Sequence, residues 1–283
     1  KLFNDYFNVG FDSKGIKSIK NPKDPNDMDF ILQNDNNYIN YEKVFKALGH
    51  FDLVYDKNEQ SKKLESELSL FKDESKVSFT RANNDFEVIE TFSLEEDFLR
   101  WDINVSNITD TDLTILDFQL PLCFNTAYAR AWQETYLRRA IRHSYIAGHG
   151  SFIFLNKAGG DPPFLLMMPS RCTSIDCFDV ETTHDAGRFE GIYSIYLHAN
   201  KKNQNKKWRL PTPKKVIKKY SSHSYGFIFK WVKNHDQIRK NLYLNDLIDI
   251  RVMPGMTVPV GLDCKILLKT KLKEVRLQPE FKT

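Results

Sequence analysis

Side chains that could transfer protons or form paired hydrogen bonds gather between positions 130 and 149. His143, Tyr145 and His149 lie at the end of an alternating segment and in the loop after it, where a rigid sheet can present them to a ligand. A histidine acid paired with a carboxylate base would suit the interconversion of sugar anomers. The candidate catalytic residues on this reasoning are Glu134, His143 and His149. The alternative is that both histidines only hydrogen-bond to backbone groups at a sheet edge.

An aromatic residue among planar polar ones precedes these histidines. Sugars offer an apolar ring face and a rim of hydroxyl groups, so their sites combine an aromatic plane with side chains that hydrogen-bond in pairs. Trp132 could supply that plane, or it could equally pack between a short helix, expected over residues 127–136, and a sheet. The candidate sugar-binding residues are Arg130, Trp132, Gln133, His143, Tyr145 and His149.

Alternation of apolar and polar residues predicts that most of the chain forms strands. In one strand, Leu99, Trp101, Ile103 and Val105 share an apolar face, which places Trp101 in the core. In another, expected from Leu137 to Tyr145, His143 and Tyr145 share a face with Leu137, and Arg142 and Ser144 share the opposite face. Residues 164–168 are wholly apolar and predict a buried strand. The last helix is expected to begin at Asp236 and to turn Ile238 and Leu242 inward.

These elements have the spacing of an antiparallel sandwich, at roughly 8 to 13 residues per strand. The sequence therefore predicts an all-β protein, a large two-sheet antiparallel supersandwich with a few short helices. No internal repeat or clear linker divides the chain, so one domain over residues 1–283 is expected.

Charge and hydropathy disfavour two classes of partner. The net charge is +4, from 41 basic and 37 acidic side chains, which is too balanced to demand a nucleic acid. The segment 201–219 is basic and without acids, but only Trp208 and nearby Tyr220 interleave with its charges, which favours a solvated loop. No apolar run approaches the ~18 residues of a membrane span. We expect neither a nucleic acid nor a membrane as partner.

Cysteines and short motifs give no sign of a metal or cofactor. Cys123, Cys172, Cys177 and Cys264 are sparse and lack the spacing of a zinc site, and their disulfide state stays open. The chain has no phosphate-binding glycine loop and no nucleophile elbow, so we expect no metal and no cofactor. Two adjacent sequons, at Asn104 and Asn107, would permit glycosylation in a eukaryotic secretory pathway.

Several segments in sequence order carry a family resemblance. They are FNVGFDSKGIKSI, WDINVSN, RHSYIAGHGSFIFLNKAGGDPPFLLMMP, YGFIFKW and DIRVMPGMTVP. Together they resemble the β-supersandwich that precedes an (α/α)6 toroid in an uncharacterised family of glycoside-hydrolase-like proteins. The supersandwich is similar to the galactose-mutarotase-like fold.

The resemblance implies a carbohydrate context and export from the cytoplasm, so a secreted or periplasmic location is expected. In such proteins the main catalytic carboxylates come from the toroid. The chain is then the non-catalytic N-terminal module of a larger protein or processed enzyme, a glycosidase, bracing the toroid and lining a cleft for an oligosaccharide or polysaccharide. The alternative is an aldose-1-epimerase-type enzyme that acts on free sugars.

Overall fold

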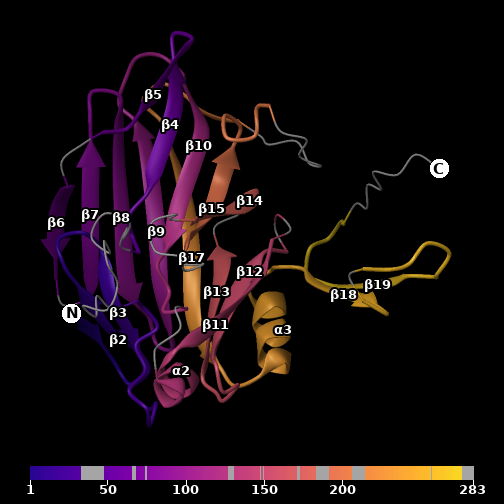
Figure 1. Ribbon diagram of the computed structural model, residues 1–283. Helices are drawn as coiled ribbons and strands as arrows, with labels where there is room; N and C mark the ends of the chain where they lie inside the picture. Colours follow the sequence, from indigo (N-terminus) through magenta and orange to yellow (C-terminus); the bar gives the residue numbers. More distant parts are fainter. Residues whose placement is uncertain are drawn as a thin grey trace. The chain divides into compact units, whose positions relative to one another are not determined.

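The computed structural model describes residues 1–32, 48–65, 68–73, 75–126, 131–146, 148, 150–170, 173–182, 191–205, 214–255 and 257–275. Strands dominate these residues and helices are short, as the alternation predicted (Figure 1). The chain divides into two compact units, residues 1–233 and 234–283. Among the described residues, no helix is long and apolar enough to cross a membrane.

Two large antiparallel sheets make up most of the first unit. The larger contains β6 (Leu68–Lys72), β7 (Lys76–Ala82), β8 (Phe86–Leu94), β9 (Phe98–Asn107), β11 (Ala140–Tyr145), β12 (Phe152–Lys157), β13 (Phe164–Ser170) and β17 (Ser222–Val232). Its eight strands have the order β11-β12-β13-β17-β9-β8-β7-β6. This order makes β11 and β6 the two edge strands of the sheet.

The second sheet of this unit has six strands. They are β4 (Asp52–Lys57), β5 (Gln60–Lys63), β10 (Leu113–Leu122), β14 (Cys177–Thr182), β15 (Gly191–Ala199) and β16 (Lys215–Ile217). The order is β14-β15-β10-β4-β5, with β16 also paired to β10, so β14 is an edge strand. A small sheet of β1 (Leu2–Phe3), β2 (Asn8–Phe11) and β3 (Ile16–Lys20) completes the strands of the unit.

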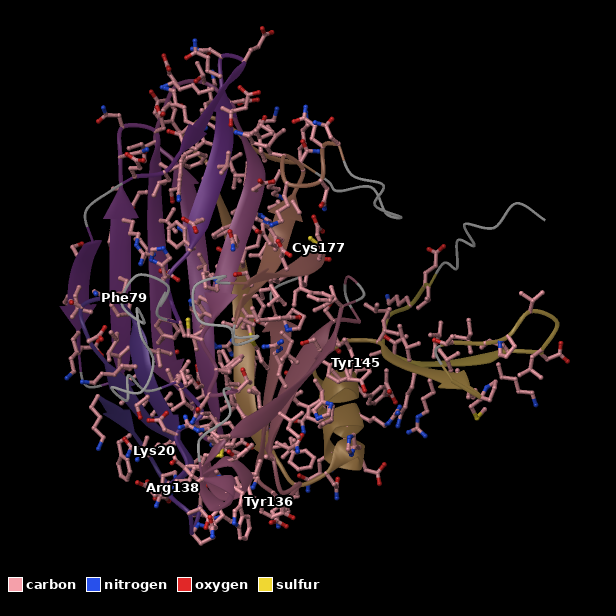
Figure 2. The ribbon with its side chains drawn as sticks, in the orientation of Figure 1. Lys20, Phe79, Tyr136, Arg138, Tyr145 and Cys177 are labelled. Carbon is pink, nitrogen blue, oxygen red and sulfur yellow. The ribbon has the colours of Figure 1, made fainter. Side chains whose placement is uncertain are left out.

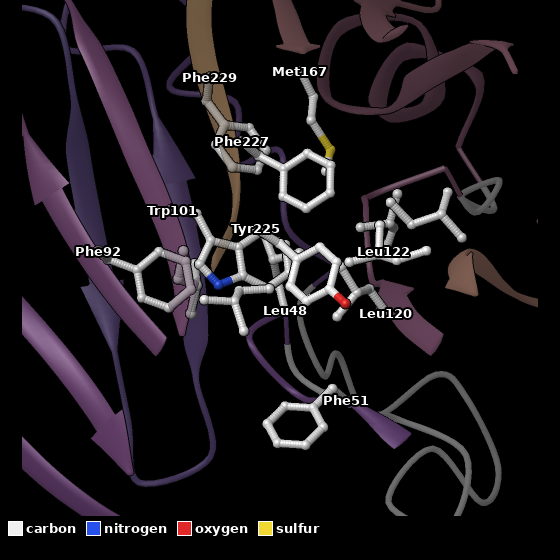
Figure 3. Close-up of a cluster of buried hydrophobic side chains, with 14 of the residues drawn as sticks. Leu48, Phe51, Phe92, Trp101, Leu120, Leu122, Met167, Tyr225, Phe227 and Phe229 are labelled. Atoms are coloured by element: carbon white, nitrogen blue, oxygen red, sulfur yellow. The ribbon is translucent and has the colours of Figure 1, made fainter. Parts of the chain in front are cut away.

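The two large sheets face each other across one hydrophobic core. Tyr55 of β4 meets Phe86 of β8 with 5.0 Å between ring centroids, and Phe118 of β10 meets Tyr225 of β17 at 5.3 Å. Figure 3 shows part of this core, where Trp101 lies beside Phe92 and Phe227. All four apolar residues of the β9 face, Leu99, Trp101, Ile103 and Val105, are fully buried, which confirms the alternation on which their assignment depended.

The boundary between helix and strand before β11 differs from the prediction. Helix α2 covers Trp132–Arg138, so Leu137 is helical and the strand begins only at Ala140. The Arg139 N–H still donates to the Thr135 carbonyl, at 3.2 Å, which continues the helical bonding. Arg138 in the last turn also favours the helix, because a positive charge suits its C-terminal end.

Part of the basic segment is also ordered as a strand. Lys215–Ile217 form β16, which pairs with β10 from Leu113 to Ile115. Ile217 is buried, while Lys218 forms an exposed ion pair with Asp112 at 2.8 Å. Two further strands were also not predicted. Strand β5 is wholly polar. In β14, Phe178 and Val180 do alternate with polar residues, but the run is short.

The described residues of the second unit form one helix and one hairpin. Helix α3 covers His235–Leu244, and its N-cap is Asn234, whose Oδ1 accepts the Gln237 N–H at 3.0 Å. The predicted cap, Asp236, lies instead in the first turn, where a negative charge is also favourable. Ile238 and Leu242 are buried, as predicted. Strands β18 (Asp249–Met253) and β19 (Lys265–Lys269) form the hairpin.

Candidate functional site

The predicted sugar-binding residues of helix α2 are exposed. Trp132 is 71% exposed, so it does not pack between helix and sheet. Gln133 is exposed beside it. Glu134 Oε1 accepts from Arg139 Nη2 at 2.9 Å, and Arg139 in turn donates to Asn125 Oδ1 at 2.6 Å. Glu134 therefore belongs to an ion pair that fixes the chain between α2 and β11.

His143 and Tyr145 share a face of β11, as predicted, and both stack on neighbouring rings. His143 Nε2 lies at hydrogen-bond distance, 2.8 Å, from Asn156 Oδ1, and its ring stacks on Phe154 with centroids 4.4 Å apart. Tyr145 stacks on Phe152 at 4.6 Å. His143 and Glu134 thus have other partners and do not contact each other. Arg130 and His149 lie outside the described residues.

The opposite face of β11 carries Arg142 and Ser144 into the space between the two sheets. The guanidinium of Arg142 lies 3.7 Å from the centre of the Tyr193 ring, on β15 of the facing sheet. Ser144 lies beside the same tyrosine. We refer to Arg142, Ser144 and Tyr193 as the Arg142 cluster. The cluster joins β11, an edge strand of the larger sheet, to β15, which neighbours the edge strand β14 of the other sheet. Figure 2 labels Tyr145 at the end of β11 and Cys177 at the start of β14.

The Arg142 guanidinium is partly buried and carries an uncompensated charge. In the part of the chain that the structure describes, it makes no hydrogen bond and no ion pair, and its neighbour is the Tyr193 ring. Burial lowers the pKa of Arg142 from its usual value, because removal from water disfavours the charged form. Removing a cation from water without a hydrogen bond or an anionic partner costs free energy, so protein structures seldom contain such a group.

Two hydroxyl groups of the cluster are also buried without a partner. The Ser144 Oγ and Tyr193 hydroxyl atoms have no hydrogen bond of normal geometry among the described residues. Burial raises the pKa of Tyr193, while the nearby Ser144 hydroxyl and the Arg142 charge act against that rise. Among the described residues, the cluster therefore offers a positive charge and two neighbouring hydroxyl groups without a hydrogen bond of normal geometry.

Exposed apolar side chains lie next to the cluster on β14. The Phe178 ring stacks on the Tyr193 ring with 5.3 Å between centroids, and Val180 pairs with Tyr193 across the ladder. Phe178 is 49% exposed and Val180 is 40% exposed. An aromatic plane beside planar polar groups is the combination that sugar sites use. The structure thus provides this combination at residues other than those that the sequence suggested.

A lone carboxyl group precedes β14. The Asp176 N–H donates to the Tyr196 carbonyl at 2.8 Å, but its Oδ2 is buried and has no hydrogen-bond partner in the described part of the chain. Burial raises the pKa of Asp176 to about 7. Burial, and to a smaller extent the same carboxyl, raises the pKa of Tyr225, whose hydroxyl lies 2.8 Å from His198 Nε2. Asp176, Tyr225 and His198 form a second polar group between the sheets.

Asp176→Asn is expected to stabilise the protein above neutral pH. The folded state raises the pKa of this carboxyl, so the folded protein holds the proton longer than the unfolded chain, and stability falls as pH rises from about 4 to about 7. The neutral amide does not titrate, so the variant avoids this loss. Its free energy of unfolding should exceed that of the wild type by about 1 to 2 kcal/mol at pH 8, a range that allows for solvent screening, and by almost nothing at pH 4. Urea unfolding at both pH values measures this. Asp161→Asn, at an exposed position, is the control, and an equal gain at both pH values would contradict the explanation.

Sequence reasoning missed the Arg142 cluster, although one signal was present. Arg142 and Ser144 share a face with Ala140, so the edge strand carries polar side chains on the face that turned out to be inward. Asp176 was one of several acids near this stretch, and nothing in its spacing distinguished it. The partner residues Tyr193 and Phe178 gave no sequence signal.

Neither metal binding nor disulfide bonding is found among the described residues. No three His, Cys, Asp or Glu side chains gather there to hold a metal ion. Cys123, Cys177 and Cys264 are free thiols, and burial raises the pKa of Cys177. Cys172 lies outside the described residues.

Comparison with known proteins identifies a family. Residues 47–281, well over half of the chain, match the profile of a family of unknown function, DUF5695. The chain belongs to the DUF5695 family. A comparison of this DUF5695 sequence with curated proteins finds no match.

Solved structures share the fold of this DUF5695 protein. A polysaccharide lyase superposes with a TM-score of 0.70 and 15% identity, over 89% of this chain and 36% of the lyase. The DUF5695 chain thus spans about a third of the length of that enzyme. A putative aldose 1-epimerase from Escherichia coli K12 gives a TM-score of 0.53 and 9% identity, over 82% of this chain and 98% of the other.

A galactose mutarotase-like protein from Lactobacillus casei ATCC 334 also superposes. Its TM-score is 0.50 with 9% identity, over 82% of the DUF5695 chain and 99% of its own. At such identities the likeness shows the fold alone. It confirms the predicted galactose-mutarotase-like β-sandwich.

Proposed function

We propose that this protein is a carbohydrate-associated, non-catalytic module of a larger exported glycoside-hydrolase-like protein, in which it braces a helical toroid domain and lines its sugar site. The observation that carries the sugar contact is the exposed Phe178 ring, held by stacking on Tyr193 beside the Arg142 guanidinium. The polysaccharide lyase, which shares the fold within a longer chain, supports a role as one part of a larger enzyme.

The Phe178 ring meets the physical requirements of a sugar platform. Its contact with Tyr193 limits its motion before any ligand arrives, which lowers the entropy cost of binding. Its exposed face can cover the apolar face of a sugar ring. The hydroxyls of Ser144 and Tyr193 can then bond to the rim of the sugar, because neither makes a hydrogen bond of normal geometry to the described residues.

The acidic residues near this site support binding over hydrolysis. Glycoside hydrolysis needs two carboxyl groups that face each other across the sugar. Glu134 pairs with Arg139, and Asp179 pairs with Lys202. Burial alone raises the pKa of Asp176, without a second carboxylate nearby among the described residues. These placements favour catalytic carboxylates supplied from outside this chain.

Calorimetric titration with a panel of neutral and acidic oligosaccharides tests the proposal. We expect binding by the wild-type protein, and Phe178→Ala should weaken it about 3- to 10-fold through loss of the stacking contact. Phe71→Ala is the matched control, because Phe71 is an exposed phenylalanine on β6, at the other edge of the eight-stranded sheet from β11. Trp132→Ala tests the exposed tryptophan of α2 separately.

Two results would count against this function. A folded wild-type protein that binds none of the oligosaccharides would remove the sugar contact altogether. Equal losses in Phe178→Ala and Phe71→Ala would show that binding does not depend on the β14 edge.

A further inference from the structure

We propose that the Arg142 cluster binds the carboxylate of an acidic sugar, so that the oligosaccharide recognised by this protein contains uronate residues. This inference rests on the proposed function and specifies its ligand. It concerns the charge and the donor groups of Arg142, Ser144 and Tyr193, which the sugar contact of Phe178 alone does not require.

The first argument is that Arg142 differs from the other buried cations of the same unit. Each of those has a carboxylate partner: Arg81 with Glu90, Arg139 with Glu134, and Lys157 with Asp24. Arg142 has none among the described residues, although it is partly buried. A bound anion would supply the missing charge.

The second argument is geometric. The guanidinium lies over the Tyr193 ring at 3.7 Å from its centre, which occupies one face of the planar group and limits its rotation. Its N–H groups point along the edge of that plane and can donate in parallel to two oxygens of a carboxylate. Lysine could not replace this paired donation, because its ammonium is a point charge.

The third argument is the number of unused donors. The hydroxyls of Ser144 and Tyr193 lie near each other beside the guanidinium, and neither makes a hydrogen bond of normal geometry to the described residues. A carboxylate only accepts hydrogen bonds and has about four lone-pair sites. One guanidinium and two hydroxyls would therefore be satisfied together by one such group.

The neighbouring side chains indicate that the anion is part of a sugar. Phe178 and Val180 expose apolar surface directly beside the cluster. A uronate presents a carboxylate and an apolar ring face on the same molecule, and a free inorganic anion presents only the charge. The combination of surfaces therefore favours the acidic sugar.

The decisive experiment compares a uronate oligosaccharide with the same oligosaccharide after its carboxyl groups have been reduced to alcohols. By calorimetry, the wild-type protein should bind the acidic form at least about 10-fold more tightly. Arg142→Gln should bind both forms equally, at the level of the reduced sugar. Arg142→Lys should recover only part of the difference. Arg138→Gln, the same change at an exposed arginine of α2, should behave as wild type.

Each contrary result has a separate meaning. If the reduced sugar binds as tightly as the acidic one, the uronate inference is wrong while the proposed function stands. If no saccharide binds, both are wrong. If a sulfated neutral oligosaccharide binds as tightly as the uronate and is equally sensitive to Arg142→Gln, the site is a general anion site and carboxylate recognition is refuted.

A second variant covers the possibility that Arg142→Gln disturbs folding, which circular dichroism and thermal unfolding will show. Tyr193→Phe keeps the ring under the guanidinium and beside Phe178 but removes the hydroxyl. It should weaken uronate binding about 3- to 10-fold and leave the reduced sugar unaffected. Equal effects on the two sugars would contradict the assigned role of the hydroxyl.

Discussion

Asp24→Asn should lower the free energy of unfolding by about 3 to 5 kcal/mol, because it leaves the ammonium of Lys157 buried without its anion. Lys157 is 2% exposed and Asp24 is 7% exposed. The Asp24 carboxylate accepts from Lys157 and from the Met28 N–H, the latter at 3.2 Å. The amide can still accept from the backbone, so the change isolates the charge.

Urea unfolding measures this loss against two comparisons. Asp112→Asn makes the same substitution in the exposed pair with Lys218, and it should cost less than about 1 kcal/mol. The double variant Asp24→Asn with Lys157→Met removes both charges and should regain most of the lost stability. A double variant no more stable than Asp24→Asn would show that the buried charge is not the cause.

Asn107→Ala should destabilise the protein by about 2 to 3 kcal/mol, because it removes a buried amide that donates to three backbone carbonyls. Asn107 is 2% exposed. Its Nδ2 donates to the carbonyls of Thr111, Ile217 and Lys218, at 2.8, 3.0 and 3.2 Å. One amide thus ties the end of β9 to the turn before β10 and to the end of β16.

Asn104→Ala is the matched control, since Asn104 is the half-buried asparagine of the preceding sequon. Its side chain bonds to Ser106 and Ser224, and we expect a loss of about 1 kcal/mol. Similar unfolding midpoints for the two variants would refute the special role of Asn107. Because an N-linked glycan attaches to Nδ2, a glycan on Asn107 is incompatible with the native hydrogen bonds.

Much of the fold could be predicted because its signals are local. A strand buried on one face must alternate along the sequence, so Leu99 and Trp101 could be assigned to the core without any knowledge of their partners. The predicted start of the strand at Leu137 was wrong because a local pattern does not show where a helix ends. Alternation there was compatible with a strand, but the helical hydrogen bond between Arg139 and Thr135 continued α2 past that point.

The sequence by itself determined the all-β class, the core face of β9 and the presence of a helix near residue 238, because each depends on the spacing of apolar side chains within one segment. Only the tertiary structure decided which polar side chains meet. Arg142 and Tyr193 are on different sheets and far apart in the chain, and their contact follows from the packing of β11 across from β15. No local pattern records such packing, because it depends on how two complete sheets bury their shared core.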